Sequence, residues 1–296
     1  MAIEEQAATL RRFNRTYTQR IGALDESFLG TGRPLGPSRL LFEVGEEGAT
    51  VRALRDRLGL DAGYLSRLLR TLEADGLVAV RPDPDDRRRR GVTLTRRGRT
   101  ARRRLDARSE DLARALVAPL SERQRERLTE ALATADLLVR AATVHLDPVA
   151  PTDPRAVAAM EAYFAEIGER FGFEPGDAWQ QDAASMAAPD GFFVVASSDG
   201  EPVACGGVHR LPDASQGPAA EIKRMWVHGD WRGAGLGARL LRHLEGLSRE
   251  RGFALVRLDT NDVLHEAIAM YGRAGYHPIE PYNDNPWARC WFEKTL

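Results

Sequence analysis

The sequence predicts two domains: a mainly α-helical domain with one β-hairpin over residues 1–143, and an α/β domain over residues 144–296. Its 296 residues exceed the length of one typical domain. Apolar residues recur at helical spacing in the first half, whereas strand-like and helix-like segments alternate in the second. Charge divides similarly. Residues 1–147 hold 28 Arg, no Lys and 22 acids, a net charge of +6; the remainder holds 14 Lys plus Arg and 21 acids, a net charge of −7.

The composition excludes several classes of protein. With 43% hydrophobic residues the chain can build cores, and no apolar run approaches the roughly 18 residues of a membrane span. The acidic N-terminus is unlike a secretory signal. The two cysteines, Cys205 and Cys290, and the six histidines lack metal-ligand spacing. We therefore expect a cytoplasmic protein without a metal or a membrane partner. The basic half favours a polyanionic partner, although a general preference for arginine is the alternative.

The first half is expected to fold as a series of short helices with a hairpin. Thr50 and Asp61 are suited to cap two consecutive helices, which end at Gly59 and Gly76. Two apolar runs around a polar tip predict the hairpin. The elements expected in chain order are helices over 4–28, 40–44, 51–58 and 62–74, strands over 77–80 and 92–94, and helices over 96–117 and 121–143.

Two short helices joined by a tight turn and followed by a hairpin are typical of a winged helix-turn-helix. The helix over 62–74 buries its leucines and leaves polar residues outward. The hairpin tip carries four consecutive arginines, which suit a narrow minor groove. The alternative is a solvated basic loop. The residues expected to contact double-stranded DNA are Tyr64, Ser66, Arg67, Arg70, Asp86, Arg88 and Arg89.

The stretch from Leu54 to Gly98 resembles the MarR family of regulators. The resemblance rests on the helix "YLSRLLRTLE", the following "GLV", the wing "DxR" at Asp86 and Arg88, and the closing "LTxxG". It covers about residues 20–143. It implies a homodimer whose first and last two helices pack between subunits, with recognition helices in successive major grooves. The family's wing Asp positions the Arg in the minor groove.

Beyond a segment over about 144–154 that is expected to be an extended strand and linker, the second half alternates strands and helices. The elements expected are helices over 154–171, 238–251 and 263–273 and strands over 192–196, 203–209, 222–227, 254–258, 276–279 and 290–292. A glycine-rich turn, "RGAGLG" at 232–237, joins a strand to a helix. Closely spaced glycines before a helix let backbone N–H groups converge on a phosphate. The Arg-x-x-Gly-x-Gly spacing argues against the dinucleotide-binding alternative.

This half resembles the GNAT superfamily of N-acetyltransferases. The resemblance rests on "RGAGLG" after "EIKRMWV", and on Leu258–Asn261 followed by "AIAMYGRAGY" at 267–276. It covers about residues 150–296 and implies direct acetyl transfer from acetyl-CoA to an amine. Many members carry an Asn near the position of Leu264; here that contact is absent or is moved to Asn261. The residues then expected to bind acetyl-CoA are Met225, Trp226, Val227, Arg232, Gly233, Ala234, Gly235, Leu236, Gly237 and Asn261.

Acetyl transfer needs a proton acceptor for the amine and a donor for the departing thiolate. Glu221, at the head of the strand before the glycine turn, is the candidate base; the alternative is a salt-bridged glutamate. Tyr271 falls where the family places the group near the thiolate; the alternative is a core tyrosine. The backbone N–H of Met225 or Trp226 is expected to contact the carbonyl oxygen.

A polar loop over 281–286, held by two prolines, is expected to contact the acceptor through Tyr282, Asn283, Asp284 and Asn285. A capped turn is the alternative. The leading hypothesis is an acetyltransferase for a small amine or amino acid, fused to a DNA-binding regulator. Two alternatives stay open: a transcription factor whose second domain only senses acetyl-CoA or another ligand, and a protein-lysine acetyltransferase targeted to DNA.

Overall fold

The computed structural model describes residues 2–296 apart from 83–88, 173–182, 199 and 213–216. By its internal contacts the chain divides into two compact units, Met1–Leu128 and Thr129–Leu296. The division falls inside helix α6 (Glu122–Thr143). A functional domain boundary at residues 143/144 stays a prediction. Within the described ranges, no helix has the length and apolar character needed to cross a membrane.

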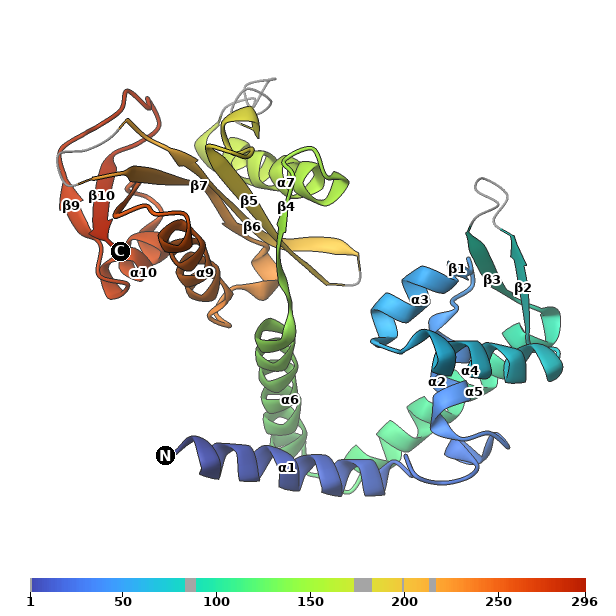
Figure 1. The fold of residues 1–296 in the computed structure, drawn as a ribbon. Helices are drawn as coiled ribbons and strands as arrows, with labels where there is room; N and C mark the ends of the chain where they lie inside the picture. The colour runs from blue at the N-terminus through green and yellow to red at the C-terminus, as the bar shows by residue number, and fades with distance from the viewer. Residues whose placement is uncertain (1, 83–88, 173–182, 199, 213–216) are drawn as a thin grey trace. The chain divides into compact units, whose positions relative to one another are not determined.

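The first unit is helical with a small sheet (Figure 1). Its strands are hydrogen-bonded in the order β1-β3-β2, all antiparallel. Its elements are α1 (Ile3–Arg20), η1 (Phe28–Gly30), α2 (Leu35–Glu43), β1 (Ala49–Thr50), α3 (Val51–Leu58), α4 (Ala62–Ala74), β2 (Val78–Pro82), β3 (Arg90–Leu94), α5 (Arg96–Val117) and the start of α6.

Side-chain caps begin α3 and α4 where the sequence predicts them. The Thr50 hydroxyl accepts a hydrogen bond from the Ala53 N–H at 3.1 Å, and the Asp61 carboxylate accepts one from the Tyr64 N–H at 2.9 Å. Thr95 caps α5 in the same way through the Gly98 N–H, at 2.9 Å. A Cβ at position 98 would overlap the Leu77 carbonyl oxygen, which explains the glycine in the "LTxxG" motif.

Two features of the first unit differ from expectation. The first helix does not reach residue 28. It ends at Arg20, because Gly22 adopts φ 65°, and Phe28 starts the separate 3-10 turn η1. The strand β1 was not predicted, since two residues carry no periodic pattern. It pairs Ala49 with Val92 and so joins the start of α3 to the hairpin.

The second unit is built on a seven-stranded sheet with the strand order β4-β5-β6-β7-β8-β10-β9. The β7–β8 pair is parallel and the other pairs are antiparallel. Its elements after α6 are β4 (Leu146–Val149), α7 (Pro154–Phe171), β5 (Gly191–Ser198), β6 (Glu201–Arg210), β7 (Ala219–Val227), η2 (Gly229–Trp231), α9 (Leu236–Glu250), β8 (Leu255–Thr260), α10 (His265–Arg273), β9 (His277–Ile279) and β10 (Cys290–Thr295).

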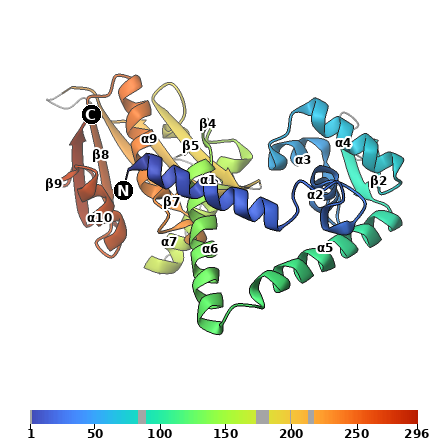
Figure 2. The ribbon, with the colours of Figure 1, turned by 90° about the horizontal axis from the view of Figure 1, so that it is seen from below.

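Helices cover both faces of this sheet, as two views of the ribbon show (Figures 1 and 2). Successive side chains of a strand point to opposite faces. In β5, Phe192 and Val194 join the core beneath α9, whereas Phe193 and Val195 join the core beneath α7. The central strands are therefore buried on both sides.

The last turn of α6 belongs to the second unit and packs against α9 and η2. The Arg239 guanidinium on α9 donates hydrogen bonds to the carbonyl oxygens of Ala141 and Val144, at 2.6 and 2.5 Å. Arg140 lies over the Trp231 ring, 4.3 Å from its centroid. Ala141 and Val144 are both buried in the core beneath α9.

Candidate functional site

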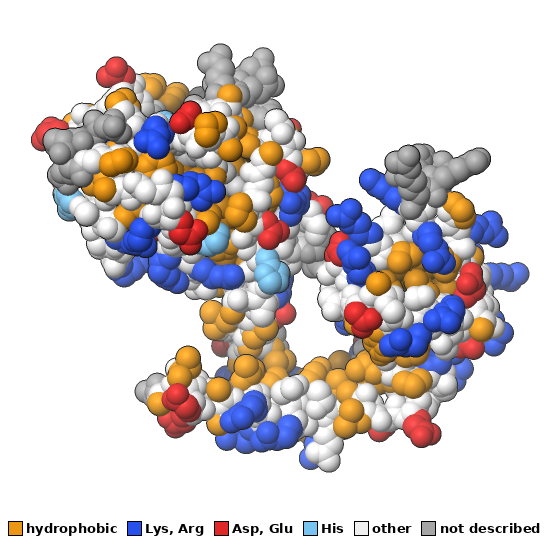
Figure 3. Space-filling model, in the orientation of Figure 1, with side chains coloured by type: hydrophobic (Ala, Val, Ile, Leu, Met, Phe, Trp, Pro, Cys, Tyr) orange, Lys and Arg blue, Asp and Glu red, His pale blue; other side chains and the backbone are white. Residues whose placement is uncertain are grey.

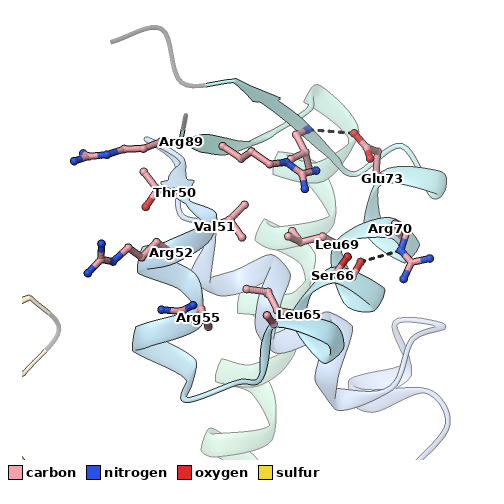
Figure 4. Close-up of a pocket in the computed structure, with 13 residues that line it drawn as sticks. Thr50, Val51, Arg52, Arg55, Leu65, Ser66, Leu69, Arg70, Glu73 and Arg89 are labelled. Carbon is pink, nitrogen blue, oxygen red and sulfur yellow. Dashed lines mark hydrogen bonds between the residues drawn. The ribbon is translucent and has the colours of Figure 1, made fainter. Parts of the chain in front are cut away.

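The first unit carries an arginine-lined cavity of about 680 Å³ between α3, α4 and the hairpin (Figure 4). Leu65 and Leu69 form its floor. Its one lining carboxylate, Glu73, accepts a hydrogen bond from the Val80 N–H at 3.2 Å. The lining cations are Arg52, Arg55, Arg70, Arg89 and Arg90. This surplus of positive charge beside α4 favours the binding of a polyanion.

The predicted DNA-contacting residues on α4 lie on its exposed face. Tyr64, Ser66, Arg67 and Arg70 are exposed, while the leucines between them are buried. The Arg67 guanidinium lies over the Tyr64 ring at 5.6 Å, and Arg70 donates to the Ser66 carbonyl oxygen. Arg89 is exposed directly before the hairpin's second strand, whereas Asp86 and Arg88 lie outside the described residues. Figure 3 shows Lys and Arg side chains gathered around this part of the first unit.

In the second unit, β7 leads through η2 into a glycine turn at the start of α9. Gly233 and Gly235 adopt φ 79° and 78°, and space is open where each would carry a Cβ. Gly235 is the N-cap of α9 and provides no side-chain cap. The first backbone N–H groups of α9 therefore lack side-chain partners and point out of the helix end. This arrangement suits a phosphate group.

The Arg232 side chain does not point into that turn. Its Nη2 lies 2.5 and 2.6 Å from the two carboxylate oxygens of Glu166 on α7, and its Nε donates to the Val227 carbonyl oxygen at 3.0 Å. Glu166 also accepts a hydrogen bond from the Trp226 indole at 2.8 Å. Burial alone would raise the pKa of Glu166, but the hydrogen bonds from Arg232 and Trp226 outweigh it and lower the pKa. Arg232 thus anchors the turn to α7.

The parallel ladder between β7 and β8 has three residue pairs and ends at Glu221 and Arg257, although both strands continue. We call this place the ladder end. The Glu221 side chain is 2% exposed there. Its Oε2 lies 2.6 Å from His209 Nε2 and 3.5 Å from Lys223 Nζ. Its Oε1 accepts hydrogen bonds from the Tyr282 hydroxyl at 2.8 Å and the Asn283 amide at 3.1 Å.

These contacts decide the charge of Glu221. Burial on its own would raise the pKa of the carboxyl group, yet the hydrogen bond from His209, the charge of Lys223 and the Tyr282 hydroxyl together lower it. Glu221 is therefore ionised at neutral pH. Burial and the Glu221 charge raise the pKa of Tyr282, so its phenol keeps its proton and donates it in the hydrogen bond.

The polar loop before β10 reaches a second carboxylate at the ladder end. The amides of Asn283 and Asn285 donate to Asp259 Oδ2 on β8, at 2.8 and 3.0 Å. The Asn283 amide thus bridges Glu221 and Asp259. Asp284 is exposed. The Asn261 side chain bonds the Trp287 carbonyl oxygen and the Val263 N–H, at 2.7 and 3.1 Å.

A bulge in β7 redirects the backbone between Glu221 and the glycine turn. Cys205 pairs with Trp226 but Gly207 pairs with Lys223, so Gly206 faces two residues of β7. One of them, Arg224, has φ 56°, the left-handed region that costs a non-glycine residue about 1 kcal/mol or more. Bulges of this kind re-aim backbone groups beside functional sites. Met225, a predicted acetyl-CoA contact, directly follows.

Tyr271 on α10 is 6% exposed and packs on Tyr276 and Phe292, with ring centroids 5.9 and 6.1 Å away. Burial, with the charges of Tyr163 and Asp259, raises the pKa of its phenol. The group stays protonated at neutral pH and is suited to donate a hydrogen bond. Its role toward a thiolate stays a prediction.

Three ladder-end residues were not anticipated: His209, Lys223 and Asp259. Lys223 and Asp259 lie inside motifs already singled out, two residues from Glu221 and from Asn261. His209 gives no signal in the sequence, because its position opposite Glu221 depends on the β6–β7 register. Cys205 is fully buried, which raises the pKa of its thiol. No group of three His, Cys, Asp or Glu residues in the described ranges is arranged to hold a metal.

Two family models match the chain. Residues 156–276 match the acetyltransferase (GNAT) family, and residues 31–89 match the MarR family. An IAA acetyltransferase from Azospirillum brasilense is 33% identical over 118 residues, which are 39% of this chain and 74% of that protein. An uncharacterised N-acetyltransferase from Schizosaccharomyces pombe is 30% identical over 43% of this chain and 77% of its own length.

A crystal structure from Klebsiella pneumoniae, assigned as an acyl-CoA N-acyltransferase, is also similar. It is 31% identical, with a TM-score of 0.41, and covers 52% of this chain and 99% of its own.

Proposed function

We propose that this chain, which belongs to the GNAT acetyltransferase family and carries a MarR-family domain ahead of that part, transfers acetyl groups from acetyl-CoA to a small amine or amino acid. One observation carries the proposal: strand β7 bears the buried, ionised Glu221 near its start and leads through η2 into the open glycine turn at the head of α9. A base on this strand and a phosphate-binding turn that follows it are two of the parts that acetyl transfer from a CoA thioester requires.

The chemistry follows from these positions. The pyrophosphate of acetyl-CoA binds the N–H groups at the glycine turn, aided by the dipole of α9. The acceptor's ammonium group, drawn by Glu221 and Asp259, gives a proton toward Glu221. The free amine forms a C–N bond to the acetyl carbon and the C–S bond breaks. The nitrogen then loses a second proton to solvent, and the departing thiolate, which accepts a hydrogen bond from the Tyr271 hydroxyl, takes up one proton. The bulge supplies the Met225 or Trp226 N–H to the carbonyl oxygen.

We further propose that the MarR-family part binds double-stranded DNA as a homodimer. The arginine-lined cavity and the exposed face of α4 support contact with the grooves. The helix α1 buries none of its residues, and Leu10, Phe13 and Tyr17 are 59, 49 and 47% exposed. A second copy covering this apolar face is the partner that the proposal requires.

The test is release of free thiol from acetyl-CoA in the presence of a panel of amino acids, polyamines, aminoglycosides and IAA. Release with one acceptor class, lost in Glu221→Gln and slowed in Tyr271→Phe, supports the enzyme and identifies its acceptor. Glu201→Gln, an exposed residue at the start of β6, serves as the matched control. No release from any acceptor, with acetyl-CoA still bound in calorimetry, would favour the sensor alternative.

A further inference from the structure

Asn283, in the polar loop before β10, makes four hydrogen bonds to the protein through its side-chain amide. Its Nδ2 donates to Glu221 Oε1 on β7 at 3.1 Å and to Asp259 Oδ2 on β8 at 2.8 Å. Its Oδ1 accepts from the Trp291 indole at 2.9 Å and from the Asn285 N–H at 3.4 Å. An amide side chain has two N–H hydrogens and two carbonyl lone pairs. These four contacts therefore use the whole hydrogen-bonding capacity of Asn283.

Only one orientation of the amide satisfies these partners. An indole N–H and a backbone N–H can only donate a hydrogen bond, whereas an ionised carboxylate can only accept one. Turning the amide over would place its NH2 group against two donors and its oxygen against two carboxylates. Trp291 lies directly opposite Asp259 in the β8–β10 ladder, so the two side chains share one face of the sheet. The Trp291 indole thus fixes which end of the Asn283 amide meets the carboxylates.

We infer that Asn283 is a positioning residue for acetyl transfer: it holds the Glu221 and Asp259 carboxylates side by side for the acceptor's ammonium group, and Trp291 fixes its orientation. The inference rests on the proposed acetyl transfer. Two anionic groups close together repel each other, and an amide that donates to both offsets this repulsion. Because no donor or lone pair of the amide is left over, Asn283 acts on the acceptor through the two carboxylates and not by the direct contact expected from the sequence.

The neighbouring residues of the loop do not join the two carboxylates. The Tyr282 hydroxyl donates to Glu221 at 2.8 Å, and the Asn285 amide donates to Asp259 at 3.0 Å. Among the described side chains of this loop, only Asn283 contacts both. Loss of its amide therefore removes the one link between the carboxylates that the loop provides.

The test measures kcat and KM for acetyl transfer by the full chain carrying Asn283→Ala, Trp291→Phe or both. Asn283→Ala should lower kcat about tenfold to a hundredfold, because displaced catalytic groups reduce the rate of the chemical step. A direct contact between Asn283 and the acceptor would instead raise the acceptor's KM and leave kcat unchanged. Trp291→Phe keeps an aromatic ring but removes the N–H donor, and should lower kcat about twofold to tenfold.

The double variant shows whether Trp291 acts through Asn283. In a chain that already lacks the Asn283 amide, Trp291→Phe should lower kcat no further, since its effect passes through that amide. Trp287→Phe is the matched control: it makes the same change at an indole that is 46% exposed, directly after the loop, and should leave kcat unchanged. Asn283→Asp, which keeps the size of the side chain, is measured in parallel and should lose at least as much activity as Asn283→Ala. Calorimetry of acetyl-CoA binding identifies any variant that fails to fold.

Three results would overturn the inference and leave the proposed function standing. They are an unchanged kcat in Asn283→Ala, a raised acceptor KM as its only effect, and losses from Asn283→Ala and Trp291→Phe that multiply in the double variant. A wild-type chain that binds acetyl-CoA but transfers acetyl to no acceptor would overturn both. The failure of the inference and the failure of the proposed function are thereby distinguishable.

Discussion

Arg232 and Glu166 form an ion pair that ties the glycine turn to α7, in which one guanidinium nitrogen, Arg232 Nη2, lies 2.5 and 2.6 Å from the two carboxylate oxygens. The two residues are distant in sequence, and the Trp226 indole shares the same carboxylate. The arginine at the head of the "RGAGLG" motif therefore holds the glycine turn in place by binding Glu166 on α7.

Removing the negative charge of Glu166 should loosen this anchor. In Glu166→Gln we expect acetyl-CoA affinity, measured by calorimetry, to fall about fivefold to tenfold. A charge-assisted hydrogen bond contributes about 1.5–3 kcal/mol, and only part of this free energy affects the conformation of the glycine turn. Glu169→Gln, an exposed change on the same helix, is the control. Equal affinity in the two variants would contradict the role of the ion pair.

The Glu166 carboxylate also makes the free energy of unfolding depend on pH. Its pKa is lowered from an ordinary 4.5, so its contribution to folding is fully present above that pH and is lost as the pH falls through the folded-state pKa. We expect the wild-type chain to lose unfolding free energy below pH 4.5 more steeply than Glu166→Gln, in urea titrations at fixed pH. Parallel curves for the two proteins would contradict this.

Gly235 is needed for its backbone conformation. A Cβ at φ 78° costs about 1–2 kcal/mol and would stand where the pyrophosphate is proposed to bind. Gly235→Ala should therefore lower the melting temperature and weaken acetyl-CoA binding by about tenfold or more. Gly246→Ala lies in the same helix with open space around its Cβ and no positive φ, and should stabilise the protein slightly instead.

The pair of Glu245 on α9 and Lys294 on β10 is a test of buried charge. Lys294 Nζ lies 2.7 Å from Glu245 Oε2, and the two side chains are 22 and 6% exposed. Lys294→Met leaves the carboxylate without this partner and should cost about 3–5 kcal/mol of unfolding free energy. Adding Glu245→Met should recover most of the loss in the same denaturation assay; a double variant as unstable as the single would refute the coupling.

For the first unit, the prediction concerns how strongly the affinity for DNA depends on salt concentration. Arg70 lines the cavity between α3, α4 and the hairpin. If it contacts a phosphate, Arg70→Ala should weaken binding and reduce the slope of log K against log salt by about 1. Arg249→Ala, an exposed arginine in the second unit, should leave the slope unchanged.

Much of the fold was predictable because local signals agree with the tertiary structure. The helix over 62–74 is the clearest case: Asp61 caps it, and leucines at helical spacing mark its buried face. The features missed depend on register or on a partner distant in sequence. His209 becomes part of the site only through its cross-strand pairing, and the Arg232 side chain turns toward a glutamate on another helix. Neither the hydrophobic periodicity nor a motif of the sequence indicates the His209–Glu221 pairing or the Arg232–Glu166 ion pair.

The way α6 ends has a consequence for the engineering of such fused chains. Its last turn contributes Ala141 to the acetyltransferase core, and Arg239 binds the carbonyl oxygens of Ala141 and Val144. The division between the two compact units therefore lies inside a continuous helix. If the first unit is replaced by another regulator, the new last helix must place an apolar side chain and two carbonyl oxygens where Ala141 and Val144 place theirs. Otherwise the engineered chain must keep the final turn of α6.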